Sequence, residues 1–168
     1  MSGLVFAAIA PHGSCAILGA VAAAEDELAR RTQAAMAELG RRFAQARPDS
    51  VVILTPHNVH VEGAMAVVTA GSTAGGLADW GAPGISLKAT VDRELAEHLK
   101  AGLRAAGIPV VGVSFGGNNP HEAVHPMDWA VLVPLWFMGG RPRRAPPASG
   151  RGQARRQPPA PAGRSGRP

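Results

Sequence analysis

The hydrophobic pattern of the first sixty residues predicts a helix between two strands. Residues 4–10 and 51–54 are apolar runs with the length of buried strands. From Asp26 onward, apolar side chains recur at steps of three and four for about five turns, and the periodicity ends at Pro48. Such an order is typical of a βαβ unit, in which the two strands lie parallel.

The rest of the chain continues with elements of the same kind. In order, the pattern predicts a strand over 64–70, a glycine-rich loop over 71–84, a weak strand over 85–90, an amphipathic helix over 91–106 ended by Gly107, a strand over 109–113, a polar loop over 114–128, and an apolar helix or strand over 130–138. The fold class expected from this pattern is α/β, with a mostly parallel sheet flanked by helices and incomplete at the C-terminus.

Charge divides the chain into a body and a tail. The net charge is +5 over 168 residues, but eight of the seventeen basic residues are arginines of segment 141–168, which has no acidic residue. The remaining nine basic residues face twelve acidic ones, so we expect no specific nucleic-acid partner. The tail has no large apolar side chain to bury. We therefore expect one domain over 1–139 and a disordered tail rich in Arg, Pro, Gly and Ala over 140–168.

Cysteine content and the N-terminal sequence indicate a cytoplasmic protein. The single cysteine, Cys15, excludes an internal disulfide and fits a reducing compartment. The apolar N-terminal run has no preceding Lys or Arg and is interrupted by Pro-His-Gly-Ser at 11–14. We therefore expect neither a signal peptide nor a membrane anchor.

Two of the six histidines follow directly on predicted strands. His12 comes after the first apolar run and His57 after the second. The carboxyl ends of parallel strands meet at one edge of a sheet, so these imidazoles can converge there. Imidazole is a common metal ligand, and the placement predicts a metal held by His12 and His57. The alternative is that both are ordinary solvated or hydrogen-bonded loop histidines.

Other candidate residues carry weaker signals. His98 falls among charged residues of the second predicted helix and is expected on the surface. His60 is expected at the rim of the site, and Glu62 could orient a histidine through its free ring nitrogen. Cys15 could join a zinc site, although a small buried apolar role is the simpler interpretation.

Three segments together resemble one enzyme family. "AIAPHG", "ILTPHNVHVEG" and "HPMDWAVLVPL" are similar to segments of the class III extradiol ring-cleavage dioxygenases, the family of the protocatechuate 4,5-dioxygenase catalytic (beta) subunit. Memo-like proteins share that fold. The resemblance covers residues 3 to about 138 and implies a chain that is C-terminally truncated relative to the family.

The resemblance implies specific roles for these histidines. His12 and His57 would be ligands of a non-haem Fe(II), with zinc or another divalent metal as the alternative. A catecholic aromatic and O₂ would be the substrates, and association with a second copy is a further expectation. The general acid/base of such a site is usually a histidine, and His125, or else His121, would take that role here.

Two departures from the family pattern bear on activity. The family's third ligand is a glutamate near the end of a longer chain, whereas no acidic residue follows Asp128. Glu62, Glu122 or Asp128 would have to substitute for it. Trp129 also stands where many members carry a histidine. The expected function is an extradiol dioxygenase-like protein, inactive if the carboxylate is missing. The alternatives are a non-catalytic metal-binding or vestigial fragment, or a Memo-like protein without dioxygenase activity.

Overall fold

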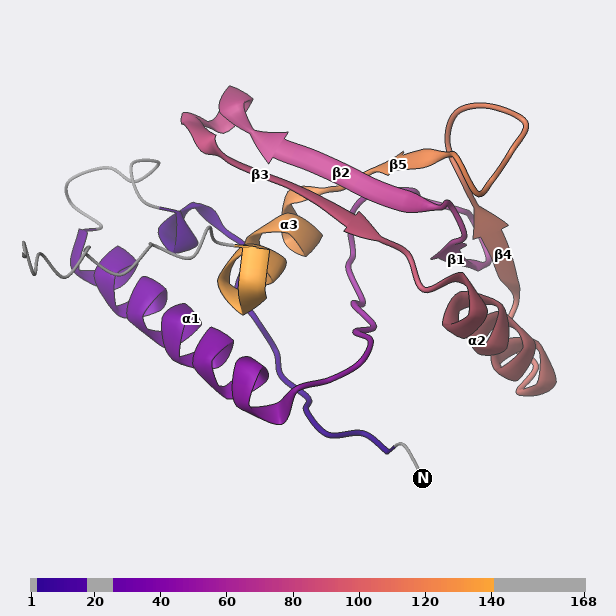
Figure 1. The fold of residues 1–168 in the computed structure, drawn as a ribbon, viewed down its shortest axis with the longest axis horizontal. Coiled ribbons are helices and arrows are strands. Elements are labelled where there is room, and N and C mark those ends of the chain that lie inside the picture. The colour runs from indigo at the N-terminus through magenta and orange to yellow at the C-terminus, as the bar shows by residue number, and fades with distance from the viewer. Residues whose placement is uncertain (1–2, 18–25, 141–168) are drawn as a thin grey trace, which may run out of the picture.

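The fold combines two small β-sheets with helices packed against them (Figure 1). The computed structural model describes residues 3–17 and 26–140. It confirms the predicted α/β class, with a parallel sheet and a second sheet of mixed direction. The predicted tail lies outside the described residues except for its first position, Gly140.

The first sheet is a parallel pair, β1 (Met65–Val68) with β4 (Val110–Val113). Helix α2 (Arg93–Ala105) packs beside this pair, and its amphipathic pattern buries Ala96 and most of Lys100. The Asp92 carboxylate caps the helix by accepting from the Leu95 N–H at 3.0 Å. Just beyond its other end, Gly107 adopts a left-handed φ of 75°. The predictions for these three elements are therefore confirmed, to within a few residues at each end.

The second sheet has the order β3-β2-β5. Strand β2 (Ser72–Leu77) is antiparallel to β3 (Ala82–Thr90) and parallel to β5 (Val124–Pro126). The hairpin of β2 and β3 ends in a short 3-10 turn, η3 (Ala78–Trp80). The expected loop over 71–84 was wrong, because glycine removes the side-chain periodicity that marks a strand while leaving the backbone able to pair. The expected polar loop over 114–128 likewise contains β5.

The hydrophobic core lies between the second sheet and two helical segments. Helix α1 (Asp26–Ala46) confirms the first predicted helix, and its Met36 is only 1% exposed. The apolar stretch 130–138 proves to be helical: α3 (Trp129–Leu135) is followed by a further turn, η4 (Trp136–Gly140). Leu132 and Val133 of α3 pack with Met36 and with Leu77 of β2. Helix α3 begins at Trp129, which contacts His57, so the packing of α3 in the core fixes the position of the candidate histidines.

The two predicted strands at 4–10 and 51–54 are not strands in the described structure. Neither segment has a hydrogen-bonded strand neighbour, and Leu4, Ile9 and Leu54 are 87%, 101% and 81% exposed. The N-terminal segment instead runs as coil beside α1, with Phe6 edge-to-face on Phe43 at 5.7 Å (Figure 1). The predicted βαβ unit is therefore wrong. An apolar run shows that a segment can be buried, but a strand also needs a backbone partner.

A short 3-10 helix, η1 (Ser14–Ala16), completes the described elements before α1. Within 3–17 and 26–140, none of the helices combines the length and hydropathy that crossing a bilayer requires.

Gly75 provides a test of how tightly β2 packs against the segment that enters α3. A methyl group at this position would overlap the carbonyl oxygen of Met127 and lie 3.0 Å from the Met127 Cβ. We expect Gly75→Ala to lower the free energy of unfolding by about 1–3 kcal/mol, the usual cost of overpacking. Urea unfolding monitored by circular dichroism measures the change.

Gly76→Ala is the matched control in the same strand. A Cβ there would meet its nearest neighbour, the Ile85 carbonyl oxygen, at 3.5 Å, which is ordinary contact. Its effect should stay within about 0.5 kcal/mol. Equal effects of the two substitutions would contradict the close approach of β2 and Met127.

Candidate metal centre

His12 and His57 lie together although 45 residues separate them in the sequence. Their Nε2 atoms are 3.1 Å apart, and their ring centroids are 5.1 Å apart at an interplanar angle of 79°. Both residues are partly buried. The expected convergence of these two imidazoles is therefore present, although the strands that were expected to deliver them are not.

A short anchored turn holds His12. The chain forms a hydrogen-bonded turn directly after it, in which the Ala16 N–H donates to the Gly13 carbonyl at 3.0 Å. Ala16 and Ile17, at 2% and 6% exposure, are buried in the core, and the Gln33 side chain of α1 donates to the Cys15 carbonyl at 3.5 Å. These contacts tie the segment after His12 to α1 and restrict where its imidazole can lie.

His57 is held by its own loop and by an aromatic neighbour. Its backbone N–H donates to the Thr55 hydroxyl oxygen at 3.1 Å. The Trp129 ring covers its imidazole with centroids 4.5 Å apart and planes tilted by 37°. Trp80, on the hairpin tip, lies 5.3 Å from Trp129. The stack limits rotation of the His57 ring and shields one of its faces from water.

The distance between the two nitrogens is the distance at which they can share a cation. Two nitrogens each about 2.1 Å from one metal ion, at an angle of about 95° between the bonds, would lie about 3.1 Å apart. The same distance also suits one N–H···N hydrogen bond. Two unprotonated Nε2 atoms at this distance would face each other with lone pairs, so a proton or a metal ion is needed between them. The pair thus fits two neighbouring positions of a metal site.

His125 and Asp128 form a second group of buried polar atoms. His125, on β5, is 3% exposed, and its Nε2 lies 3.0 Å from the Asn58 Oδ1. Asp128 caps α3 through Oδ1, which accepts from the N–H groups of Ala130 at 2.6 Å and Val131 at 3.2 Å. His125 Nδ1 and Asp128 Oδ2 are buried and have no hydrogen-bond partner in the described part of the chain. Burial lowers the pKa of His125, and the Asp128 charge partly opposes this.

The other predicted residues do not join the pair. His60, Glu62, His98, His121 and Glu122 are exposed, and only the surface position of His98 was expected outright. Cys15 is a free, partly buried thiol. Across the described ranges, no three His, Cys, Asp or Glu side chains are grouped closely enough to hold a metal ion. The structure therefore brings together His12 and His57 without a carboxylate from 3–17 or 26–140 between them.

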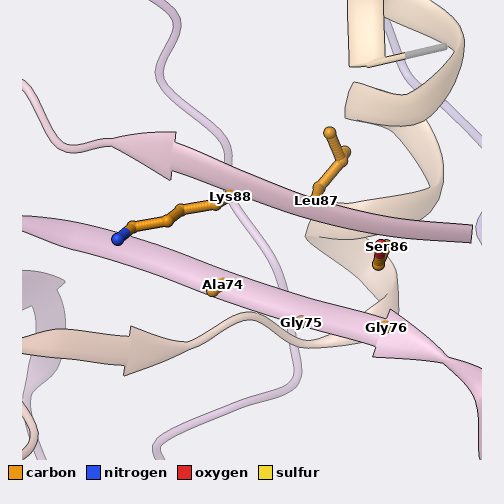
Figure 2. Close-up of a pocket in the computed structure, with 6 residues that line it drawn as sticks. All are labelled: Ala74, Gly75, Gly76, Ser86, Leu87 and Lys88. Carbon is orange, nitrogen blue, oxygen red and sulfur yellow. The ribbon is translucent and has the colours of Figure 1, made fainter. Parts of the chain in front are cut away.

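An open cleft of about 530 Å³ lies on the β2–β3 hairpin, apart from the histidines. Figure 2 shows that Ala74, Gly75 and Gly76 carry little or no side chain on β2, and that Lys88 extends from β3 towards β2. The cleft has one cationic side chain and no histidine or carboxylate among its lining residues. It therefore lacks the histidine and carboxylate side chains that a metal site of this kind requires.

Two residues of the site had no usable sequence signal. An Asn after Pro-His is typical of a turn and gives no sign of the contact that Asn58 makes with β5. Trp80 lies in the segment that was predicted to be a loop, and its approach to Trp129 depends on the β2–β3 hairpin. Trp129 was noted only as a departure from the family pattern, whereas the structure places it against His57.

Fold and site together define an α/β protein with a pair of converging imidazoles and a buried histidine that is linked to the His57 loop through Asn58. The sequence matches the family of the catalytic LigB subunit of aromatic ring-opening dioxygenase over residues 6–149. The chain belongs to this family, as the resemblance of its three segments implied. No curated protein matches the chain.

The buried state of His125 predicts how stability depends on pH. Because its folded pKa is below the usual 6.5, the unfolded chain binds a proton more readily. The contribution of neutral His125 is complete above pH 6.5 and is lost as the pH falls towards the folded pKa. The free energy of unfolding should fall by at most about 1.4 kcal/mol per pH unit from this group.

His125→Gln should flatten this part of the stability–pH curve, measured by urea unfolding between pH 7.5 and 5. His98→Gln, at an exposed position of α2, should leave the slope of the wild-type curve unchanged. A His125→Gln curve parallel to that of the wild type would show that this imidazole is not held neutral by burial.

Proposed function

We propose that this protein is an extradiol-type, Fe(II)-dependent ring-opening dioxygenase-like protein whose metal is held by His12 and His57. The observation that carries the proposal is the 3.1 Å approach of the two Nε2 atoms from segments 45 residues apart. Membership of the ring-opening dioxygenase family supplies the reaction class. Zinc or another divalent metal is the alternative occupant.

Each neighbouring residue has a separate task under this proposal. His12 and His57 provide two neutral nitrogen ligands at neighbouring positions. Trp129 holds the plane of the His57 ring and keeps water from one face. His125, neutral and buried, is the group that can accept a proton from a bound hydroxyl. Fe(II) held by His12 and His57 would mediate electron transfer between an aromatic diol and O₂.

A second function is favoured by the ligand set itself. The described residues bring only two metal-ligating side chains together, and no third joins them. A site of two ligands would suit a protein that binds a metal ion without opening a ring, as a Memo-like or vestigial member of the family. Glu62, Glu122 and Asp128 remain the acidic side chains that a full site in 3–17 and 26–140 would recruit.

The partners that follow from the proposed reaction are a small aromatic substrate with vicinal hydroxyl groups and O₂. Association with a second copy is part of the same proposal, since exposed apolar side chains at 4–10 and 51–54 would be covered by it. A cytoplasmic location agrees with the single free cysteine.

Metal titration tests the ligand pair. Fe(II) under anaerobic conditions, or Co(II) as a stable probe, should bind the wild type and quench the fluorescence of Trp129. His12→Ala and His57→Ala should each weaken binding more than tenfold, because loss of a residue that merely supports a ligand already costs about 10–100-fold. Loss of the quenching in Trp129→Phe would show that the fluorescence signal comes from Trp129.

His60→Ala and His98→Ala are the matched controls, since both histidines are exposed. Both should bind metal as the wild type does. If either control loses affinity while His12→Ala and His57→Ala keep theirs, the ligands have been chosen wrongly.

Ring opening is tested separately from binding. Protein reconstituted anaerobically with Fe(II) is mixed with catechol and then exposed to O₂. A yellow ring-opened product in the wild type, absent with His57→Ala, supports the dioxygenase function. Metal binding without product supports the non-catalytic alternative.

A further inference from the structure

The Asn58 side chain joins the His57 loop to the strand that carries His125. Its Nδ2 donates to the Pro126 carbonyl oxygen at 2.9 Å, and its Oδ1 lies 3.0 Å from His125 Nε2. One amide group thus holds His125 and Pro126, which lie 67 and 68 positions further along the sequence.

The hydrogen-bonding partners fix the orientation of this amide. A backbone carbonyl can only accept, so the Asn58 atom facing Pro126 must be the NH₂ group. The Asn58 oxygen therefore faces His125, and it too can only accept. The proton between them must belong to His125 Nε2. The neutral imidazole then has no proton on Nδ1, which becomes an acceptor.

We infer that Asn58 is a positioning residue that fixes His125 as its Nε2–H tautomer and thereby keeps Nδ1 as a buried hydrogen-bond acceptor for a hydroxyl group of the ligand. The tautomer follows from the two hydrogen bonds alone. The identity of the donor, a ligand hydroxyl, rests on the proposed function.

The backbone at Asn58 supports this role. Asn58 has a φ of 78°, in the left-handed region that few residues other than glycine enter. Asparagine tolerates this conformation better than most. The turn directs the amide towards β5 immediately after His57, so the residue that follows one candidate ligand also sets the proton on the buried imidazole.

The absence of a donor to His125 Nδ1 among the described residues indicates what kind of group would satisfy it. His125 Nδ1 and Asp128 Oδ2 are both buried and lack a donor among the described residues. A buried acceptor without a partner costs free energy, and an O–H group satisfies it. A neutral hydroxyl fits this need, because burial disfavours the imidazolium that would turn Nδ1 into a donor.

The tautomer is measured on the full chain without metal. Protein labelled with ¹⁵N in histidine is examined by long-range ¹H–¹⁵N correlation, which distinguishes the protonated ring nitrogen from the unprotonated one. His125 should show a protonated Nε2, with an N–H proton protected from exchange with water, and an unprotonated Nδ1. A proton on Nδ1 at neutral pH would overturn the inference.

Asn58→Gly and Asn58→Asp separate positioning from general structure. Glycine keeps the left-handed backbone but removes both hydrogen bonds, so the Nε2 proton should lose its exchange protection. Aspartate keeps an acceptor for Nε2–H and adds a charge that favours imidazolium, so the pKa of His125 should rise by about one to three pH units. Unchanged proton protection and pKa in both variants would show that Asn58 does not position His125.

The role of the ligand is tested with catechol on protein loaded with Zn(II), which cannot turn over. Catechol should shift the Nδ1 resonance of His125 in the wild type, and the shift should be lost in Asn58→Gly. If zinc binds but catechol then causes no change in the Nδ1 resonance of His125, the acceptor role is overturned. Failure of zinc to bind His12 and His57 would instead contradict the proposed function and leave the tautomer result standing.

Discussion

The approach of His12 to His57 is the interaction on which this account depends. Two neutral imidazoles with their Nε2 atoms 3.1 Å apart repel unless a proton or a cation lies between them. The fold keeps them there through contacts that neither histidine makes itself. The turn after His12 is buried against α1, and Trp129 at the start of α3 covers His57. The positions of the two histidines therefore depend on the hydrophobic core, because residues of both α1 and α3 belong to that core.

The segment from β5 into α3 connects the core to the buried polar group. Met127 packs in the core beside Gly75, and His125 and Asp128 of the candidate site lie within two residues of it. Asp128 caps the helix that presents Trp129, while His125 is buried on β5. Asn58 then ties the His57 loop to the same segment. Displacing this short segment would therefore disturb the candidate metal ligands, the buried imidazole and the helix cap together.

The sequence predicted α1, α2 and the strands β1 and β4 well, because their signals are local or periodic. Steps of three and four identified α1 and α2, and Gly107 marked the end of α2. The strands of the glycine-rich hairpin gave no such signal, since Gly75 and Gly76 lack the side chains that reveal alternation. At 4–10 and 51–54 the apolar pattern suggested strands, but strand formation depends on a backbone neighbour elsewhere in the chain. The pattern of one segment cannot reveal that neighbour.

The candidate site was predictable only in part. The position of His12 and His57 after apolar runs led us to predict that they converge. The two imidazoles do converge, even though those runs are not paired as strands. The roles of Asn58 and Trp80 depend on tertiary contacts that their sequence neighbourhoods do not encode. Burial of His125 was equally invisible, because segment 114–128 as a whole was predicted to be a polar loop, although Ala123 and Met127 beside it are apolar and buried. The proposal that a metal ion occupies the pair rests on the distance between the two imidazole nitrogens, which the pattern of apolar and polar residues does not encode.

X-ray absorption at the iron edge tests the central claim most directly. The full chain loaded anaerobically with one Fe(II) should show scattering from two imidazole rings in the first coordination sphere. The double variant His12→Gln, His57→Gln should show none. Two imidazoles that persist in the double variant, or a wild-type spectrum with oxygen ligands alone, would contradict the account.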